Sequence, residues 1–333
     1  MHAEWNCDYL TKNGILDPWA SINYVTEKAE SVKLRKEKLE QVADKISVKI
    51  INGCLETAFM RPSGLHVYND VKLPLKDAVD RWCFICAMSF SFWSDFVPGE
   101  MKYMIKSPDG LLWKGTRALM ARFNQLIKCG IPLNATAFET MPRSVFDFFM
   151  RVRRNALPPM MAERYEVVSE VAKILTEKFD GSFYNCVEKA NNDPMQLMSL
   201  VLENFPCFRD VAIYKGQKVS FLLKAQLLIL GVSVLLEEYS GSAALDCSNY
   251  FILSTNHRNG NCSRMANQPK LRCGHLRASL TTEIVNDKLE KAEEATRVDC
   301  LDIDSFMDMD RIWTVAKIQR GQILFPRTRN IFY

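Results

Sequence analysis

The sequence has little excess charge of either sign. It contains 43 basic and 39 acidic residues, and its formal net charge is +4. Proteins dedicated to duplex nucleic acid usually carry a concentrated basic face, so this near-balance argues against direct duplex binding. It is compatible with a small anionic ligand, and the partner we predict is a small molecule.

The chain also lacks an apolar run long enough to cross a bilayer. A membrane-spanning helix needs about 20 predominantly apolar residues. The most apolar stretch, residues 221–236, is shorter and includes Lys224 and Gln226, so we predict a buried helix there. The opening residues, Met1-His2-Ala3-Glu4, do not have the pattern of a signal peptide. No association with a membrane is therefore expected.

Cysteine is plentiful, but a disulfide framework is missing. The 11 cysteines are scattered without regular spacing, and reduced thiols are typical of the cytosol and nucleus. We therefore predict a cytoplasmic location, with the nucleus as an alternative.

Metal and cofactor motifs are also missing. Cys262, Cys273 and His275 are separated by ten residues and then one, which is no common zinc-finger spacing. Cys83 and Cys86 lie within an apolar run, so both are predicted to be buried thiols. The sequence has no Walker loop, dinucleotide-binding glycine motif, GxSxG elbow or HExxH pair. Neither a metal nor a cofactor is predicted.

Helical periodicity dominates what is present. Apolar residues recur at the spacing of one helix face, and several stretches end at a Gly or Pro. We predict helices over residues 32–46, 80–92, 116–129, 161–179, 194–204, 219–239 and 281–296. Strand signals are weaker: a turn at Pro108-Asp109-Gly110 predicts a hairpin within 101–112, and Lys215-Gly216 predicts a second within 211–221. The predicted core includes Phe183, Leu197, Leu200, Phe221, Leu227 and Leu230.

Several unusual sequence segments follow one another in a characteristic order. They are residues 90–95 (FSFWSD), 177–195 (EKFDGSFYNCVEKANNDPM), 203–210 (ENFPCFRD), 218–221 (KVSF), 224–226 (KAQ) and 325–333 (FPRTRNIFY). This series resembles the queuosine salvage family, the queuosine 5′-phosphate N-glycosylase/hydrolases. The resemblance covers roughly residues 60–333 and is strongest over 158–226.

The resemblance implies a mostly α fold, a single helical unit similar to DNA glycosylases with small β-hairpins. We expect residues 1–60 to be a divergent N-terminal helical segment that forms one compact unit with the family domain at 61–333. The resemblance also implies a monomer that hydrolyses queuosine 5′-phosphate to queuine and ribose 5-phosphate without a cofactor. The alternative, from another functional class, is a catalytically impaired relative that binds the nucleotide or acts as a scaffold.

The position that separates these alternatives is Asn256. Residues 254–258 (STNHR) stand where the family carries Phe-Ala-Asp-Tyr-Arg, and the family's Asp acts at the glycosidic carbon. Cleavage of an N-glycoside builds positive charge on the ribose, which a carboxylate stabilises. Asn256 carries no charge, and His257 replaces the Tyr. These two are the candidate catalytic residues, although an ordinary polar loop or a faulty gene model over 240–300 also explains the departure.

The family's base-binding residues have partial counterparts in this chain. His66 stands at the place of a family His that contacts the base, and a structural His is the alternative. Asp304, with Asp308 or Asp310 as its partner, stands near the family's pair of base-binding Asp residues, although the spacing differs. A carboxylate suits the two donors of a guanine-like edge, but a solvated acidic turn is also compatible with this pattern. Residues 90–95 are either an aromatic stacking surface or a packed core corner.

Four basic residues are candidates for the 5′-phosphate, because Lys and Arg donate to phosphate oxygens. Each of them alone also suits an ordinary surface or structural cation. The candidates are Lys224, Arg258, Arg327 and Arg329.

Overall fold

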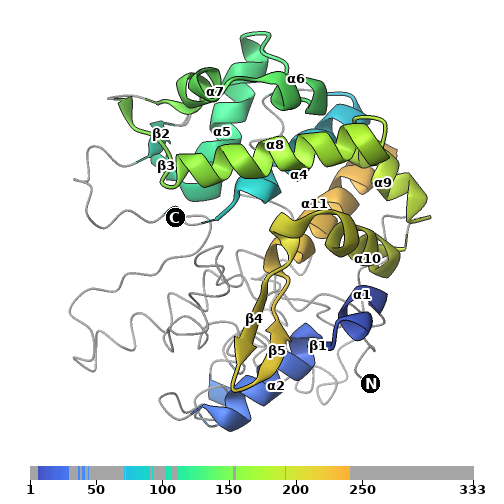
Figure 1. Cartoon of the computed structure of the whole chain (residues 1–333). Helices are drawn as coiled ribbons and strands as arrows, with labels where there is room; N and C mark the ends of the chain where they lie inside the picture. The colour runs from blue at the N-terminus through green and yellow to red at the C-terminus, as the bar shows by residue number, and fades with distance from the viewer. Residues whose placement is uncertain are drawn as a thin grey trace, which may run out of the picture.

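A computed structural model describes most of the first 240 residues. The described ranges are 7–29, 71, 73–90, 92, 103–106, 112–152, 155–191 and 193–240, with helical positions at 37, 40, 41 and 44. Most of these residues are helical, and the strands form two small sheets (Figure 1). This confirms the predicted mostly α class with small hairpins. The similarity to DNA glycosylases stays a prediction.

Helix α4 (Leu75–Met88) lies at the centre of the main core. Every residue from Ala78 to Met88 is buried, and helices α8 (Met161–Lys178), α9 (Phe183–Lys189) and α11 (Leu223–Ser240) pack around it (Figure 1). Its closest neighbour is α11, where Gly231 leaves room for the Trp82 indole. A Cβ at Gly231 would lie 2.1 Å from Trp82 Nε1. The same Nε1 donates a hydrogen bond of 3.0 Å to the Leu228 carbonyl.

A second group of helices extends the core beyond α4. It comprises α5 (Gly115–Lys128), α6 (Ala135–Thr140) and α7 (Arg143–Met150). Phe138 of α6 joins them, because its ring centroid lies 4.6 Å from Phe84, 6.3 Å from Phe123 and 6.4 Å from Phe146. Helix α6 also packs on α8, so α6 links this group to both central helices.

The larger sheet joins the start of the described chain to residues 211–220. Its order is β1 (Ile15–Leu16), β5 (Gln217–Ser220), β4 (Val211–Tyr214). Strands β4 and β5 form the predicted hairpin, and Lys215 and Gly216 have positive φ values of 45° and 84° at its turn. Strand β1 pairs with β5 in parallel. Helix α2 (Pro18–Lys28) packs on this sheet and forms a separate small apolar cluster with it.

The other predicted hairpin is also present. Strands β2 (Met104–Lys106) and β3 (Leu112–Lys114) pair antiparallel. The second strand lies slightly later than the predicted 101–112 range.

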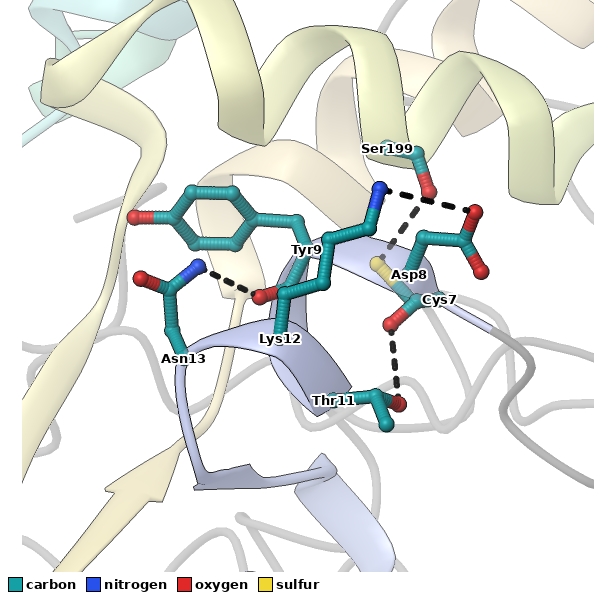
Figure 2. A network of polar contacts seen from close by, with 7 residues as sticks. All are labelled: Cys7, Asp8, Tyr9, Thr11, Lys12, Asn13 and Ser199. Carbon is teal, nitrogen blue, oxygen red and sulfur yellow. Dashed lines mark hydrogen bonds and ion pairs between the residues drawn. The ribbon is translucent and has the colours of Figure 1, made fainter.

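The short helix α1 (Asp8–Lys12) rests on α10 (Pro194–Asn204). Figure 2 shows the polar contacts here: Cys7 Sγ lies 3.4 Å from Ser199 Oγ, and Asn13 Nδ2 donates to the Tyr9 carbonyl at 2.7 Å. The Lys12 ammonium is 4.0 Å from the Asp8 carboxylate, and both side chains are largely exposed. This ion pair adds little stability, so the buried Cys7 and Leu10 supply most of the attachment.

Predicted helix positions agree best where caps are local. Helix α10 has the predicted bounds, because Asp193 accepts from the backbone N–H groups of Met195 and Gln196 and Pro194 occupies the first turn. Helices α5 and α8 lie within one residue of their predicted ranges. The range 281–296 lies outside the described residues, as does most of 32–46.

Two helices were predicted with wrong bounds. Helix α4 begins at Leu75 and ends at Met88, rather than spanning 80–92. Helix α11 begins at Leu223 rather than at residue 219, because Val219 and Ser220 pair with β4 and the backbone turns at Leu222, whose φ is 51°. Helices α1, α2, α6, α7 and α9 had not been predicted individually.

Most of the predicted core residues are buried. Phe183 and Leu197 are fully enclosed and Leu227 is 5% exposed. Leu200 is only half-buried at the edge of the core, and Phe221 belongs to the small cluster beside the sheet rather than to the main core. The side chain of Leu230 lies outside the described residues. In the part of the chain that the structure describes, no helix is long and apolar enough to cross a membrane.

Candidate functional site

Lys224, in the first turn of α11, is a buried cation. The residue is only 4% exposed. Its ammonium donates to the Cys207 carbonyl and lies 5.6 Å from the ring centroid of Phe90 and 5.8 Å from that of Phe208. Among the described residues, Lys224 has no carboxylate within ion-pair distance. A buried charge is costly unless it is paired, so this ammonium is a natural place for an anion.

Asp210 fixes where α11 begins, and thereby where Lys224 stands. Its Oδ2 accepts a 3.1 Å hydrogen bond from the backbone N–H of Lys224. Its own carbonyl accepts from the Phe221 N–H at 3.1 Å. The carboxylate thus satisfies a backbone donor in the first turn of a helix, where acidic groups are favoured.

Arg164 of α8 also contacts Phe90. Its guanidinium donates to the carbonyl oxygens of Met88 and Phe90 and, at 2.8 Å, to that of Pro159. Its Cζ lies 4.4 Å from the ring centroids of both Phe90 and Phe92. Burial lowers the pKa of Arg164 to about 9, so the group is still charged at neutral pH. Two cations therefore lie 4.4 and 5.6 Å from the centroid of one phenylalanine ring.

A second arginine closes the end of α10, which leads into the Cys207–Phe208 segment. Arg209 donates from Nε to the Leu202 carbonyl at 2.6 Å and from Nη2 to the Glu203 carbonyl at 2.8 Å. Its Cζ lies 5.1 Å from the Tyr9 ring centroid. The last carbonyls of a helix lack partners within the helix. Arg164 thus satisfies a carbonyl at the C-terminal end of α4, and Arg209 satisfies two at the C-terminal end of α10.

Asp80 anchors the most characteristic sequence segment to α4. Its Oδ1 accepts from Ser182 Oγ at 2.9 Å and from the backbone N–H groups of Phe183 and Tyr184 at 2.7 and 3.1 Å. Burial raises the pKa of this carboxyl, and the three hydrogen bonds oppose that rise. Asp80 therefore holds the first turn of α9 against the central helix.

Four of the described cysteines show the chemistry of enclosed thiols, whereas Cys129 is exposed. Burial raises the pKa of Cys83, Cys86, Cys186 and Cys207, which disfavours the reactive thiolate. Within the described ranges, no group of three or more His, Cys, Asp or Glu residues is arranged to hold a metal ion. Cys262, Cys273 and His275 lie outside these ranges.

Comparison with known proteins identifies the family. The model of the family described as queuosine salvage protein matches residues 71–246. That range contains Asp80, Arg164, Arg209 and Lys224. The chain belongs to the queuosine salvage family.

Three relatives from distant organisms share one name with each other. A Bos taurus protein named queuosine 5′-phosphate N-glycosylase/hydrolase is 29% identical over 71% of this chain and 68% of its own length. The Mus musculus protein of that name is 31% identical over 67% of this chain and 64% of its own length. The Sphaerobacter thermophilus protein of that name is 26% identical over 74% of this chain and 79% of its own. The alignments thus span between 64% and 79% of the length of these three relatives.

Of the substrate-binding and catalytic candidates named from the sequence, the described part of the queuosine salvage domain contains Lys224, together with Phe90 and Phe92 of the aromatic segment 90–95. The others, which lie outside the described residues, are His66, Asn256, His257, Arg258, Asp304, Asp308, Asp310, Arg327 and Arg329. All of these also lie outside the range that the family model matches. Their roles and their convergence on one pocket remain predictions.

Arg164 and Asp210 were missed by sequence reasoning. The signal for Arg164 was present, because it is a charged residue on the apolar stripe of α8 that includes Met161 and Val168. A charge on a buried helix face calls for a specific partner. For Asp210 the signal was its place in the segment 203–210, but its link to Lys224 depends on the turn of the intervening hairpin.

Proposed function

We propose that this protein hydrolyses the N-glycosidic bond of queuosine 5′-phosphate, releasing queuine and ribose 5-phosphate. Membership of the queuosine salvage family supports this proposal, since the named relatives are queuosine 5′-phosphate N-glycosylase/hydrolases. The structural observation that carries it is the buried ammonium of Lys224, which has no carboxylate partner among the described residues.

In this proposal, Lys224 binds the 5′-phosphate. An ammonium has three donors, and one of them reaches the Cys207 carbonyl. The remaining donors and the positive end of α11 favour an anion. The aromatic rings of Phe90 and Phe208 exclude water from this position, and the lower local dielectric strengthens attraction to a phosphate. Arg258 is proposed as a second phosphate ligand.

The reaction breaks the bond between the ribose C1′ and the base nitrogen. Water adds to C1′ and gives up a proton, while the departing base gains one, so the overall change is a hydrolysis. Positive charge develops on the ribose during cleavage, and Asn256 is proposed to lie beside it with His257. His66 and the acidic residues Asp304, Asp308 and Asp310 are proposed to bind the base. Water is the only co-substrate that this reaction needs.

Asn256 makes a slow enzyme the expected outcome. Loss of one preorganised electrostatic group typically lowers the rate by about a hundred- to a thousand-fold. Asn256→Asp should therefore raise turnover, measured by chromatography of free queuine after incubation with queuosine 5′-phosphate. If His257 has instead become the acid or base, the unmodified protein will be fast and His257→Ala will slow it. Full activity that survives both substitutions would place the catalytic residue elsewhere.

The alternative is a nucleotide-binding relative that has lost hydrolysis. Sequence position 256 is the observation that favours it, because an amide replaces the family's carboxylate. It predicts tight binding of queuosine 5′-phosphate in calorimetry and no release of queuine from the unmodified protein.

The phosphate role is tested by Lys224→Met, which keeps the length of the side chain and removes the charge. Loss of a hydrogen bond to a charged group should weaken binding of queuosine 5′-phosphate by about 10- to 150-fold. Lys218→Met is the matched control, because Lys218 is exposed on β5 and donates to the Asn13 carbonyl. Equal affinities for the two variants in calorimetry would remove Lys224 from the site.

We further propose that residues 1–60 and 61–333 act as one unit, as a monomer in the cytosol or nucleus. The parallel pairing of β1 with β5 and the contact of Cys7 with Ser199 support the single unit. Deletion of residues 1–29 should destabilise the remainder of the chain in urea denaturation, whereas independent units would leave its unfolding unchanged. Light scattering after size exclusion tests the monomer.

A further inference from the structure

Arg164 holds the backbone at the end of α4 from a distant helix. Its guanidinium donates to the carbonyls of Met88, the last residue of α4, and of Phe90, two residues later. Its Nε donates to Pro159 just before α8. Arg164 itself is fully buried, so these directional bonds fix the path of the chain as it leaves α4.

The same guanidinium also holds the side chains of that segment. The rings of Phe90 and Phe92 each have their centroid 4.4 Å from the guanidinium carbon. The planar guanidinium stacks on aromatic faces and carries a fixed fork of donors, whereas the lysine ammonium is a compact point charge. The arrangement is therefore specific to arginine and goes beyond filling the core with a positive charge.

The two rings differ in what else they can reach. Phe90 is 6% exposed and lies 5.6 Å from the Lys224 ammonium. Phe92 is only partly buried, so it retains surface for a further contact. Lys224 and Phe92 thus lie at the two ends of a short series of contacts that runs through Phe90 and Arg164.

We propose that Arg164 is a positioning residue for base recognition, which holds the Phe92 ring in place to stack on the planar base of a nucleotide whose phosphate binds Lys224. This inference rests on the proposed function and assigns recognition of the phosphate and of the base to different residues. Lys224 recognises the phosphate, and the Arg164–Phe92 pair recognises the base. Stacking of a base on an aromatic ring is sequence-tolerant and depends on the placement of the ring.

The test compares two ligands, queuosine 5′-phosphate and ribose 5-phosphate, in calorimetry of the full chain. Arg164→Lys keeps the charge but loses the planar fork. It should weaken binding of queuosine 5′-phosphate by about 5- to 150-fold, the range expected for a lost stacking contact, and leave ribose 5-phosphate within about twofold. A merely structural role would weaken both ligands together. Lys224→Met should weaken both, which makes it the control for the phosphate end.

Phe92→Leu provides a second variant that leaves Arg164 and its backbone bonds intact. It should reproduce the selective loss of queuosine 5′-phosphate affinity, and it decides the matter if Arg164→Lys does not fold. Wild-type affinity in Phe92→Leu, or an equal loss of both ligands in Arg164→Lys, would overturn the inference and leave the proposed function standing. Failure of the unmodified protein to bind either ligand would overturn the proposed function itself.

Discussion

The middle of α4 and its C-terminal end are both buried, yet they contact opposite kinds of partner. In the middle, Trp82 lies against the bare backbone of Gly231 and donates its one N–H to Leu228. At the end, the carbonyls of Met88 and Phe90 receive the charged Arg164. The interface between Trp82 and α11 is mainly apolar, and the contact at the end of α4 is built around charge.

This difference indicates where stability and function reside along one helix. Apolar contact stabilises in proportion to the area removed from water, and it recognises no particular ligand. Arg164 is a buried cation and must overcome a desolvation cost of several kcal/mol. Because it contacts the same Phe90 ring as Lys224, we expect it to have a role beyond packing. We therefore expect substitutions in the middle of α4 to change stability most, and substitutions at its end to change ligand binding most.

Trp82→Ala should have the largest effect on stability. Removal of a buried aromatic side chain typically costs about 3–5 kcal/mol, and the Leu228 carbonyl would also lose its donor. Urea denaturation measures the loss. A change below about 0.5 kcal/mol, the range of surface substitutions, would mean that the middle of α4 is not the stabilising interface.

Gly231→Ala changes the same interface from the α11 side and should have a smaller effect on stability. The added Cβ would lie 2.1 Å from Trp82 Nε1 and 2.3 Å from Cε2. Overpacking of this kind costs about 1–3 kcal/mol. Because the clash is with Trp82, the cost should shrink in a Trp82→Phe background, and a double-mutant cycle in urea measures this coupling. Additive effects would place the two residues out of contact.

Asp80 makes a contact between α4 and α9 in which the charge of the carboxyl group depends on pH. Its carboxyl pKa is raised by burial above the ordinary value of 3.8. The protonated form is therefore favoured by folding, and this contribution is present below pH 3.8 and is lost as pH rises through the higher folded-state value. Asp80→Asn keeps an acceptor for α9 and cannot ionise. The stability of the wild type relative to Asp80→Asn should thus fall as pH rises above 3.8 and level off once pH exceeds the folded-state pKa.

The matched variant for that experiment is Asp80→Ala, which removes the acceptor as well. Relative to Asp80→Asn, which cannot ionise either, it should cost about 1–3 kcal/mol at all pH values, because buried donors at the start of α9 are left unpaired. A wild type that gains stability over Asp80→Asn with rising pH would show that the hydrogen bonds to Asp80 outweigh its burial.

Lys224→Met should have the smallest effect on stability. Removing the ammonium relieves its desolvation and leaves the Cys207 carbonyl without a donor, so the two changes oppose each other and should leave the free energy of unfolding within about 1 kcal/mol. Thermal denaturation without ligand measures this. A loss as large as that of Trp82→Ala would mean that Lys224 serves mainly stability. The expected difference between the middle of α4, which stabilises the fold, and its end, which serves ligand binding, would then not hold.

Much of the helical architecture could be predicted because its signals are local. Asp193 and Pro194 specify the start of α10 from within two consecutive positions. The Lys215-Gly216 turn specifies the β4–β5 hairpin in the same way. The start of α11 could not be predicted, because the apolar run continues through Phe221 and Leu222. What ends β5 there is pairing with β4, together with the contact between Asp210 and the Lys224 N–H.

The candidate site was predictable only in part. Lys224 was named because it stands in a short segment shared with the family, and the structure places it in a buried, aromatic setting. Arg164 was missed because its partners Met88 and Phe90 lie 76 and 74 residues away in sequence. No periodicity in α8 indicates which carbonyls its guanidinium will reach.

The sequence by itself determined the family, the helical class, the two hairpins and the caps of α10, because each depends on residues that are neighbours in the chain or on an ordered series of segments. Only the tertiary structure decided which charges are buried and what they contact. Asp80, Arg164 and Lys224 each lie in an apolar helix pattern, but that pattern does not indicate which groups these charges contact. Burial of a charge is a property of the elements that pack over it, and here those elements come from distant parts of the chain.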